Sequence, residues 1–281
     1  MVRITADSTC DLSRELIEKY NISIIPLHIV MDEKEYLDGA DITPDEIYEW
    51  SDKNNTTPKT SAVGFENAMD AMKSIVDTDD EMIIFTISEK MSTTPNVFRM
   101  AAEELEVEDR VSVIESANLS TGIGLLIIEA ANMVAEGMDR AAIVAKIEEL
   151  KPQVCSSFVV DTLTYLHRGG RCSSVAALAG GMLKLHPKIV VENGAMHATK
   201  KYRGKMDSVI LDYAKDLEED LKNAKKDRVF ITHSGCNAEA IDSVKEYLQS
   251  LGHFDEILIT RAGGVISSHC GPGTLGVLYI M

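Results

Sequence analysis

The segment with the clearest chemical potential is residues 263–273, GGVISSHCGPG, in which His269 stands between an apolar run and a Gly-Pro-Gly turn. Gly271 and Gly273 tolerate positive φ and Pro272 fixes its own φ, so the chain beside the imidazole can bend sharply. We expect an exposed loop here, which is a poor place for a purely structural histidine. If hydroxyl-bearing segments from the first half of the chain meet His269, together they form a pocket for a small anion.

Hydroxyl side chains recur at three places where predicted strands give way to helices. These are Thr60-Ser61, Ser92-Thr93-Thr94, and Ser116 with Ser120-Thr121-Gly122. In an open parallel sheet, the loops that follow the strands line one crevice, and helix N-termini there carry free N–H groups and partial positive charge. Added hydroxyls make an anion site. For any single loop, simple N-capping is the competing explanation, because Ser and Thr are preferred caps.

Other catalytic constellations are weaker. Ser92, His269 and Asp161 can be combined into a triad on paper, which leaves open a small-molecule hydrolase or phosphoryl-transfer enzyme that uses Ser92 and His269. No Walker A loop or Gly-x-Ser-x-Gly elbow is present, and Gly122-Ile123-Gly124 lacks the third glycine of a dinucleotide fingerprint. The histidines show no metal-ligand spacing, so we expect no metal site. Arg168 and Arg171 could face the pocket or a partner.

Composition excludes several classes of function. The 281 residues include 28 Lys and Arg against 45 Asp and Glu, a net charge of −17, which disfavours nucleic-acid binding. The densest basic cluster is Lys200, Lys201, Arg203 and Lys205. No apolar run reaches the length of a membrane span, and we see no secretory leader. The five cysteines are widely spaced and contain no Cys-x-x-Cys, so we expect a cytoplasmic protein without disulfides or structural zinc.

The elements that must position these residues alternate between strand and helix. In the first part, apolar runs predict strands at 2–6, 22–30, 82–87 and 111–114, with helices near 12–20, 44–50, 65–76, 97–105, 125–134 and 141–150. This alternation predicts a doubly wound parallel sheet. Lys151-Pro152 is a plausible boundary, so we predict an N-terminal α/β domain over residues 1–152 that contributes the hydroxyl-bearing loops.

The second part, residues 153–281, is predicted to be a mixed α/β domain that contributes the His-Gly-Pro-Gly loop. Asn193-Gly194 joins strands 190–192 and 195–199 into a hairpin, which introduces antiparallel pairing. We also expect an Ala/Gly-rich helix near 174–183 and one long helix over 206–221. The predicted fold class is therefore α/β with two domains.

Taken together, the motifs resemble the DegV family over nearly the whole chain. The resemblance is carried by Asp7-Ser8 with Asp11-Leu12, Thr60-Ser61, Ser92-x-Thr94, Ser116 with Ser120-x-Gly122-x-Gly124, Asp161-Thr162-Leu163-x-Tyr165-Leu166 with Gly169-Gly170-Arg171, Lys200-x-x-Arg203, His233-x-Gly235, and Val265-Ile266-x-x-His269-x-Gly271-Pro272-Gly273. Each piece alone is loose, but their order and spacing together are specific.

The resemblance implies a protein that binds a long-chain fatty acid, with the carboxylate at one end of an apolar tunnel. It implies no cofactor and no catalytic step. A separate ATP-dependent fatty acid kinase subunit would make the acyl-phosphate, which passes to an acyltransferase toward phospholipid synthesis. Carried onto this chain, the ligand-binding residues are Thr60, Ser61, Ser92, Thr94, His269 and Gly271. Arg171 and Arg203 would sit near the pocket mouth or the partner surface.

Two departures from the family pattern affect the expected head-group geometry. Where the family usually has Ser-Gly-Thr, this chain has Thr93, whose Cβ limits positive φ and close backbone approach. Pro95 replaces a tyrosine, and Ala62-Val63 stands where the family often has Gln-Pro.

Overall fold

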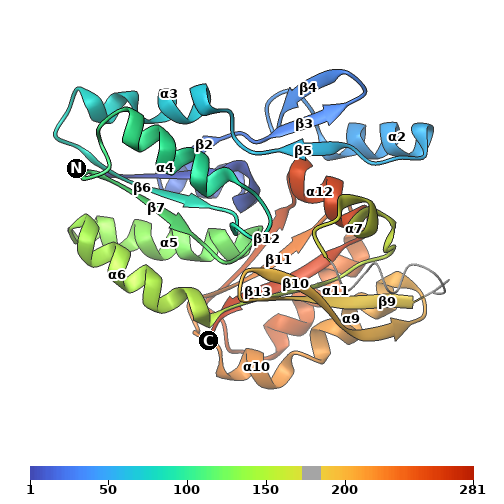
Figure 1. Ribbon diagram of the computed structural model, residues 1–281. Coiled ribbons are helices and arrows are strands. Elements are labelled where there is room, and N and C mark those ends of the chain that lie inside the picture. The colour runs from blue at the N-terminus through green and yellow to red at the C-terminus, as the bar shows by residue number, and fades with distance from the viewer. Residues whose placement is uncertain (173–184) are drawn as a thin grey trace.

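The computed structural model describes residues 1–172 and 185–281, which fold into three sheets with helices packed between and around them (Figure 1). The Ala/Gly-rich helix expected near 174–183 lies outside the described residues. The mixed α/β class with an N-terminal parallel sheet and a C-terminal mixed sheet is confirmed. The division of the chain at residue 152 stays a prediction.

The N-terminal sheet is parallel, in the order β2-β1-β6-β7. Its strands are β1 (Val2–Asp7), β2 (Ile22–Ile25), β6 (Glu81–Thr86) and β7 (Val111–Glu115). Side chains along β6 alternate in the face that they cover: Ile83 and Phe85 join the core beneath α5 (Thr121–Ala135), and Ile84 joins the core beneath α3 (Phe65–Val76). Helices therefore cover both faces of this sheet, as doubly wound folds require. The other helices of this part are α1 (Arg14–Lys19), α4 (Thr94–Glu104) and α6 (Arg140–Leu150).

The strand expected over residues 22–30 is wrong in extent. Pro26 has no N–H to donate to a ladder, and the chain breaks there into β2 and β3 (His28–Met31), which belong to different sheets. A small antiparallel sheet, β4-β3-β5, forms from β3, β4 (Lys34–Leu37) and β5 (Lys59–Ser61). Thr60 and Ser61 therefore lie on a strand, not on a loop at the parallel sheet. The predicted capping box of Thr43 and Glu46 begins α2 (Pro44–Asn54).

The C-terminal sheet has the order β10-β9-β8-β13-β11-β12, antiparallel except for the β11–β12 pair. Its strands are β8 (Val154–Val159), β9 (Leu185–Glu192), β10 (Ala195–Arg203), β11 (Arg228–His233), β12 (Glu256–Arg261) and β13 (Leu275–Ile280). The predicted Asn-Gly hairpin joins β9 and β10, with φ of 50° at Asn193 and 78° at Gly194.

The helices of this part are α7 (Thr164–Gly169), α9 (Met206–Lys215), α10 (Glu218–Asn223), α11 (Ala238–Ser250) and α12 (Gly264–Cys270). The expected single helix over 206–221 is therefore two helices. Asp216, at the break, accepts a hydrogen bond from the Tyr202 hydroxyl at 2.6 Å. The short 3₁₀ turns Ser8–Cys10 and Lys151–Gln153 complete the described elements.

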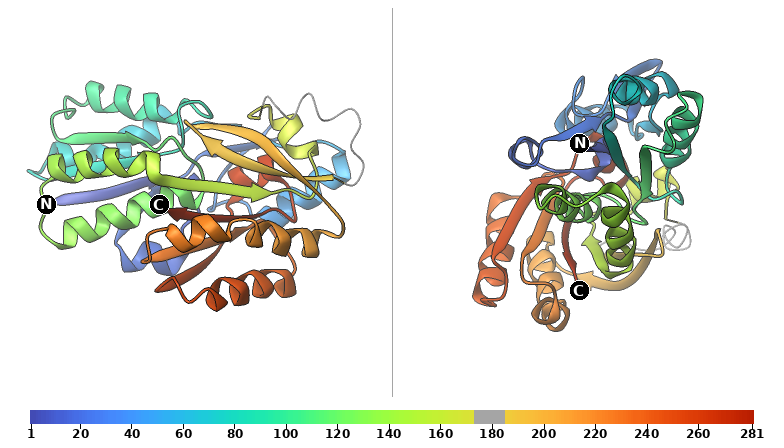
Figure 2. Two further views of the ribbon diagram at one scale, coloured as in Figure 1. Left: turned by 90° about the horizontal axis from the view of Figure 1, so that it is seen from below. Right: turned by 90° about the vertical axis from the view of Figure 1, so that its left-hand side faces the viewer.

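Helix α5 holds the two large sheets together. Its residues 121–131 are all buried, and it packs against β1 and β6 on one side and β8 and β13 on the other. Figures 1 and 2 show α5 and α6, in green, between the blue-to-teal and orange-to-red parts of the chain. The buried Glu129 forms ion pairs with Lys225, at 2.6 Å, and with Arg228. These pairs anchor the helix to the start of the C-terminal sheet.

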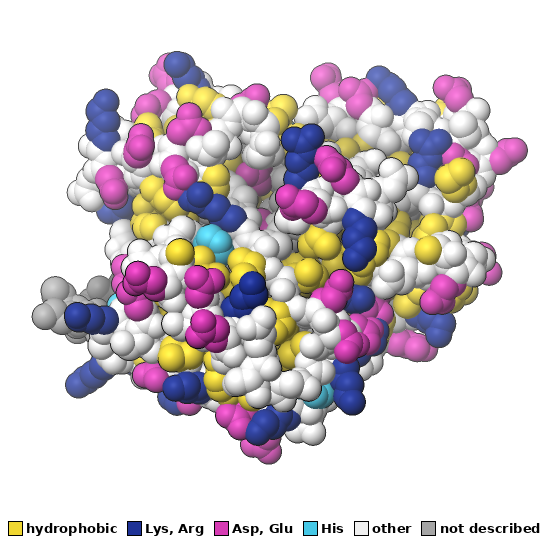
Figure 3. All heavy atoms as spheres, turned by 180° about the vertical axis from the view of Figure 1, so that it is seen from behind, with side chains coloured by type: hydrophobic (Ala, Val, Ile, Leu, Met, Phe, Trp, Pro, Cys, Tyr) yellow, Lys and Arg dark blue, Asp and Glu magenta, His cyan; other side chains and the backbone are white. Residues whose placement is uncertain are grey.

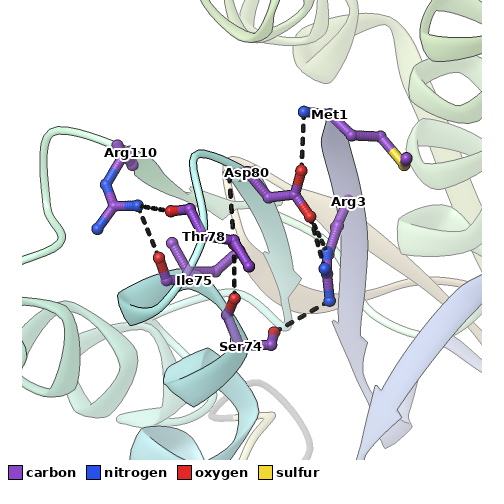
Figure 4. A network of polar contacts seen from close by, with 7 residues as sticks. All are labelled: Met1, Arg3, Ser74, Ile75, Thr78, Asp80 and Arg110. Carbon is purple, nitrogen blue, oxygen red and sulfur yellow. Dashed lines mark hydrogen bonds and ion pairs between the residues drawn. The ribbon is translucent and has the colours of Figure 1, made fainter.

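Polar contacts join the segments at the amino ends of the parallel strands (Figure 4). The Asp80 carboxylate binds the Arg3 guanidinium at 2.5 Å and the Met1 amine at 2.9 Å. Arg110 donates to the Ile75 carbonyl at 2.6 Å, at the end of α3. These contacts hold the strands together at their amino ends. The crevice is formed at the opposite edge, by their carboxyl ends.

Candidate functional site

A cavity of about 440 Å³ lies where β5, the loops after β6 and β7, and α12 converge. Thr60, Ser61, Ser92 and His269, which the sequence analysis placed at one site, all line it. Apolar side chains from these segments, from β10 and from the residue before β3 form much of the remaining wall: Leu27, Ile87, Met91, Leu119, Met196, Val265 and Ile266. Segments that are more than 200 residues apart in the chain thus present hydroxyls and one imidazole to a largely apolar space.

The segment that carries His269 is the buried helix α12, so the expected exposed loop is wrong. Every α12 residue except His269 is buried. Gly264 allows this close packing, because a Cβ there would lie 2.6 Å from Ile29 Cδ1. Gly271 ends the helix with φ of 77°, and a Cβ on it would lie 2.6 Å from Tyr165 Cδ2. Gly271 shapes the turn and does not line the cavity.

His269 is a neutral imidazole at pH 7. Its Nε2 lies 2.8 Å from Thr60 Oγ1, the hydrogen bond that joins α12 to β5. Its Nδ1 is buried against Gly169, where a Cβ would lie only 2.3 Å away. Burial lowers the pKa of His269 to about 4, and the positive charge of Arg171 lowers it further. With Nε2 bonded to Thr60 and Nδ1 against Gly169, the neutral ring positions the Thr60 hydroxyl at the cavity wall and adds no charge there.

Ser92 and Thr94 are coupled to each other at the start of α4. The Ser92 hydroxyl lies 2.9 Å from Thr94 Oγ1 and accepts the Thr94 backbone N–H at 3.2 Å. Ser92 therefore accepts the N–H of the first residue of α4 and lines the cavity at once, whereas Thr94 is fully buried behind it. Thr93 has φ of −83°, so its Cβ causes no strain, and Pro95 falls in the first turn of α4, where no N–H is needed.

The third hydroxyl-rich loop does not face this cavity. The Ser116 hydroxyl accepts the Asn118 N–H at 3.1 Å, and Ser120 donates to Asp11 at 2.5 Å. Thr121 pairs with Thr232 at 2.6 Å. These hydroxyls are used inside the fold, and the loop gives the cavity the apolar Leu119 instead. The prediction that three loops would supply hydroxyls is right for Ser92 and for β5 and wrong for this loop.

Charged side chains at the cavity include Glu89, Lys90 and Arg171. Arg171 is exposed and donates to the Gly169 carbonyl at 2.7 Å. Arg168 points elsewhere and binds Asn55 at 3.3 Å. Arg203 ends β10, is exposed, and does not line the cavity. The two arginines that the sequence grouped at the pocket mouth or partner surface are therefore separated: Arg171 lines the pocket and Arg203 does not.

A second pocket, of about 30 Å³, shares Leu119, Ile266 and Cys270 with the first as lining residues, and Phe158 and Leu278 also line it. A space with mainly apolar walls stays dry and accepts hydrocarbon. Nothing in the sequence marks this smaller pocket, because its apolar lining residues come from four segments whose pattern is that of ordinary core.

Three further properties of the part of the chain that the structure describes are its surface charge, its lack of a metal-binding cluster and its lack of a membrane-spanning helix. On the face in Figure 3, acidic and basic side chains are interspersed, and hydrophobic ones gather in the hollow between the upper and lower halves. Over residues 1–172 and 185–281, no three His, Cys, Asp or Glu side chains are grouped to hold a metal ion. None of the helices described there has the length and apolarity needed to cross a bilayer.

Comparison with known proteins places this geometry in a family. The model described as "Uncharacterised protein, DegV family" matches residues 1–281. A DegV domain-containing protein from Caldanaerobacter subterraneus subsp. tengcongensis is 30% identical over 282 residues, which cover 99% of this chain and 98% of that protein.

Solved structures agree. A DegV family protein from Thermus thermophilus, described by its fatty acid binding, superposes with a TM-score of 0.91 at 28% identity and covers 100% of this chain and 99% of its own. A stearic acid-binding protein from Eubacterium ventriosum gives a TM-score of 0.85 at 30% identity and covers 99% of this chain and 98% of its own. The chain therefore belongs to the DegV family.

Proposed function

We propose that this protein binds a long-chain fatty acid, with its carboxylate at Thr60, Ser61, Ser92 and His269 and its tail among the apolar walls. The observation that carries the proposal is the cavity itself, where hydroxyls and a neutral imidazole from three distant segments meet apolar side chains, next to a second and smaller apolar pocket. The fatty acids bound by the two related structures support the same class of ligand.

The energetics favour an amphiphile over a small polar anion. Burial of an acyl chain stabilises by about 0.8 kcal/mol per CH₂, so about 14 methylenes supply about 11 kcal/mol before ordering costs. Desolvation of the carboxylate costs several kcal/mol. Each hydrogen bond to the charged head group returns about 1.5–3 kcal/mol, so two or three hydroxyl donors offset that cost. The apolar walls provide the affinity, and Thr60, Ser61 and Ser92 fix which end enters.

We further propose that the protein presents its fatty acid and performs no catalytic step. A separate ATP-dependent kinase subunit would transfer the γ-phosphoryl group to a carboxylate oxygen, forming the acyl-phosphate and releasing ADP. An acyltransferase would then use that product in phospholipid synthesis. In support, Lys90 and Arg171 lie at the cavity and Arg203 is exposed at the end of β10, outside it, where a partner can reach it.

The geometry gives less support to a hydrolase that uses Ser92 and His269. The Ser92 hydroxyl is engaged with Thr94, and His269 Nε2 with Thr60. The low pKa of His269 makes the imidazole a weak base at neutral pH. Asp161 lies 3.5 Å from Nδ1 of His186, a different histidine. A nucleophile, base and orienting acid are therefore not assembled around Ser92.

The decisive experiment begins with solvent extraction of the purified protein and mass spectrometry of the extract. We expect one equivalent of long-chain fatty acid, and uptake of added fatty acid by the delipidated protein. Thr60→Val and Ser92→Ala should each weaken binding about tenfold, the loss of one hydrogen bond to a charged group. Thr199→Val, an exposed strand position outside the cavity, serves as the matched control.

Absence of both co-purified lipid and uptake would refute the proposal. Turnover of acyl or phosphoryl esters by the pure protein, lost in Ser92→Ala, would instead support the hydrolase.

A further inference from the structure

Two buried carboxylates hold the first turn of α12, the helix that carries His269. Asp11 accepts the backbone N–H of Gly263 at 2.8 Å, and Asp38 accepts that of Gly264 at 2.7 Å. Both acids come from the N-terminal half of the chain, more than 200 residues before the helix. The bonds satisfy N–H groups that a helix start leaves unpaired.

Each carboxylate is in turn oriented by a hydroxyl. Ser120 donates to the second oxygen of Asp11 at 2.5 Å, and Ser8 donates to that of Asp38 at 2.8 Å. The residues Asp11 and Asp38 are 6% and 4% exposed, and neither forms an ion pair with a Lys, Arg or His of residues 1–172 and 185–281. Burial raises the pKa of Asp11 to about 8. Buried acids without a cation are costly, and here the cost is offset by hydrogen bonds from the two backbone N–H groups and the two serine hydroxyls.

The bonds leave α12 little freedom to shift. A Cβ on Gly264 would lie 2.6 Å from Ile29 Cδ1 and 2.9 Å from Asp38 Oδ1, so the backbone is already in contact with both. His269 lies five residues further along the helix, about 7.5 Å at the usual rise. If the first turn of α12 slides or tilts, the helix moves as a rigid body and the His269 imidazole moves with it. The Nε2–Thr60 distance of 2.8 Å would then exceed hydrogen-bond range after a shift of about 0.7 Å.

We propose that Asp11 and Asp38 are positioning residues that clamp the first turn of α12 to the N-terminal half and thereby fix His269 against Thr60. The placement of His269 is a property of the lipid-free protein. The consequence for ligand affinity rests on the proposed function, because only there does His269 face a fatty-acid carboxylate.

The test uses nitrogen-15 NMR of the histidine side chains in the lipid-free protein, with the His269 signal assigned by its loss in His269→Gln. Asp38→Ala removes the acceptor of the Gly264 N–H. We expect water to reach the loosened imidazole, and its pKa to rise from about 4 toward the ordinary 6.5. Asp38→Asn keeps one acceptor oxygen, so it should largely restore the wild-type titration. Fatty-acid affinity should fall about tenfold in Asp38→Ala and much less in Asp38→Asn.

Glu129→Gln is the control, because Glu129 is another buried acid that joins the two halves but lies on α5 and does not contact α12. The Glu129→Gln substitution should lower the free energy of unfolding and leave the pKa of His269 unchanged. A folded Asp38→Ala protein in which His269 titrates as in the wild type would overturn the proposal.

If Asp38→Ala does not fold, Ser8→Ala is used instead, because it removes only the hydroxyl that orients Asp38. The absence of any upward shift in the His269 pKa in Ser8→Ala would then overturn the proposal. If the wild type binds no fatty acid, the proposed function fails, whereas the His269 titration still decides on the clamp.

Discussion

The buried imidazole predicts a specific loss of stability in acid. The His269 pKa is about 4 in the folded protein and about 6.5 when the chain is unfolded. Between these values the unfolded state binds the extra proton, so the free energy of unfolding falls as the pH falls through this window. The full difference corresponds to about 3 kcal/mol, reached near pH 4 and absent above pH 7.

The assay compares urea denaturation of the delipidated wild type with that of His269→Gln from pH 7.5 to pH 4.5. Glutamine keeps a polar group near Thr60 but does not titrate. Asp7 and Asp11 also titrate in this range, with pKa values raised by burial to about 6 and about 8, and they act with the opposite sign. The prediction therefore concerns the difference between the two curves, which should change by about 2–3 kcal/mol in favour of the variant as the pH falls.

The exposed His197 provides the control, since His197→Gln should follow the wild type at every pH. Parallel curves for wild type and His269→Gln would refute the reasoning. Bound fatty acid supplies a further check, because a carboxylate beside the ring favours the imidazolium and raises its pKa. The fall in the free energy of unfolding between pH 7.5 and pH 4.5 should then be smaller in the lipid complex. An unchanged loss would place the carboxylate away from His269.

Two further predictions follow from single positions. Gly169→Ala puts a Cβ 2.3 Å from His269 Nδ1, so we expect a loss of about 1–3 kcal/mol in the free energy of unfolding and weaker lipid binding. Denaturation and lipid titration check this, and a variant with wild-type values for both would contradict it. Arg203→Ala removes an exposed charge outside the cavity, so fatty-acid affinity should stay within about twofold while kinase-dependent formation of acyl-phosphate falls. A loss of lipid binding instead would place Arg203 at the pocket.

The sequence predicted much of the fold because the determinants are local. The Thr43–Glu46 capping box, the Asn193-Gly194 turn and the apolar helix at 125–134 all appear as expected. The errors fall where long-range packing decides. No local pattern shows that the strand after Pro26 joins a third sheet, and hence that Thr60 reaches His269 from a strand and not from a crevice loop.

The candidate site shows the same division between local and long-range determinants. Residue types identified Thr60, Ser61, Ser92 and His269, because hydroxyls and imidazole are chemically distinctive. Ser116 and Ser120 look equally distinctive in sequence, yet their hydroxyls bond inside the fold. Leu119, between them, lines both cavities and had no distinguishing feature. Apolar ligand walls use the same residues as a hydrophobic core, so only the three-dimensional structure separates the two.

The glycines around α12 connect these observations. Gly263 and Gly264 let Asp11 and Asp38 approach the start of the helix. Gly169 leaves room for the His269 imidazole, and the chain turns at Gly271 in contact with Tyr165. In sequence, Gly271 and Gly273 predicted a sharp bend in an exposed loop, whereas in the structure a Cβ on Gly169, Gly264 or Gly271 would lie 2.6 Å or less from a neighbouring side chain. The helix is thus held by side chains of the N-terminal half, by Asp11 and Asp38 at its start and by Thr60 near its end. If the proposed fatty acid binds here, its carboxylate meets a polar terminus that is already fixed, so binding need not order it.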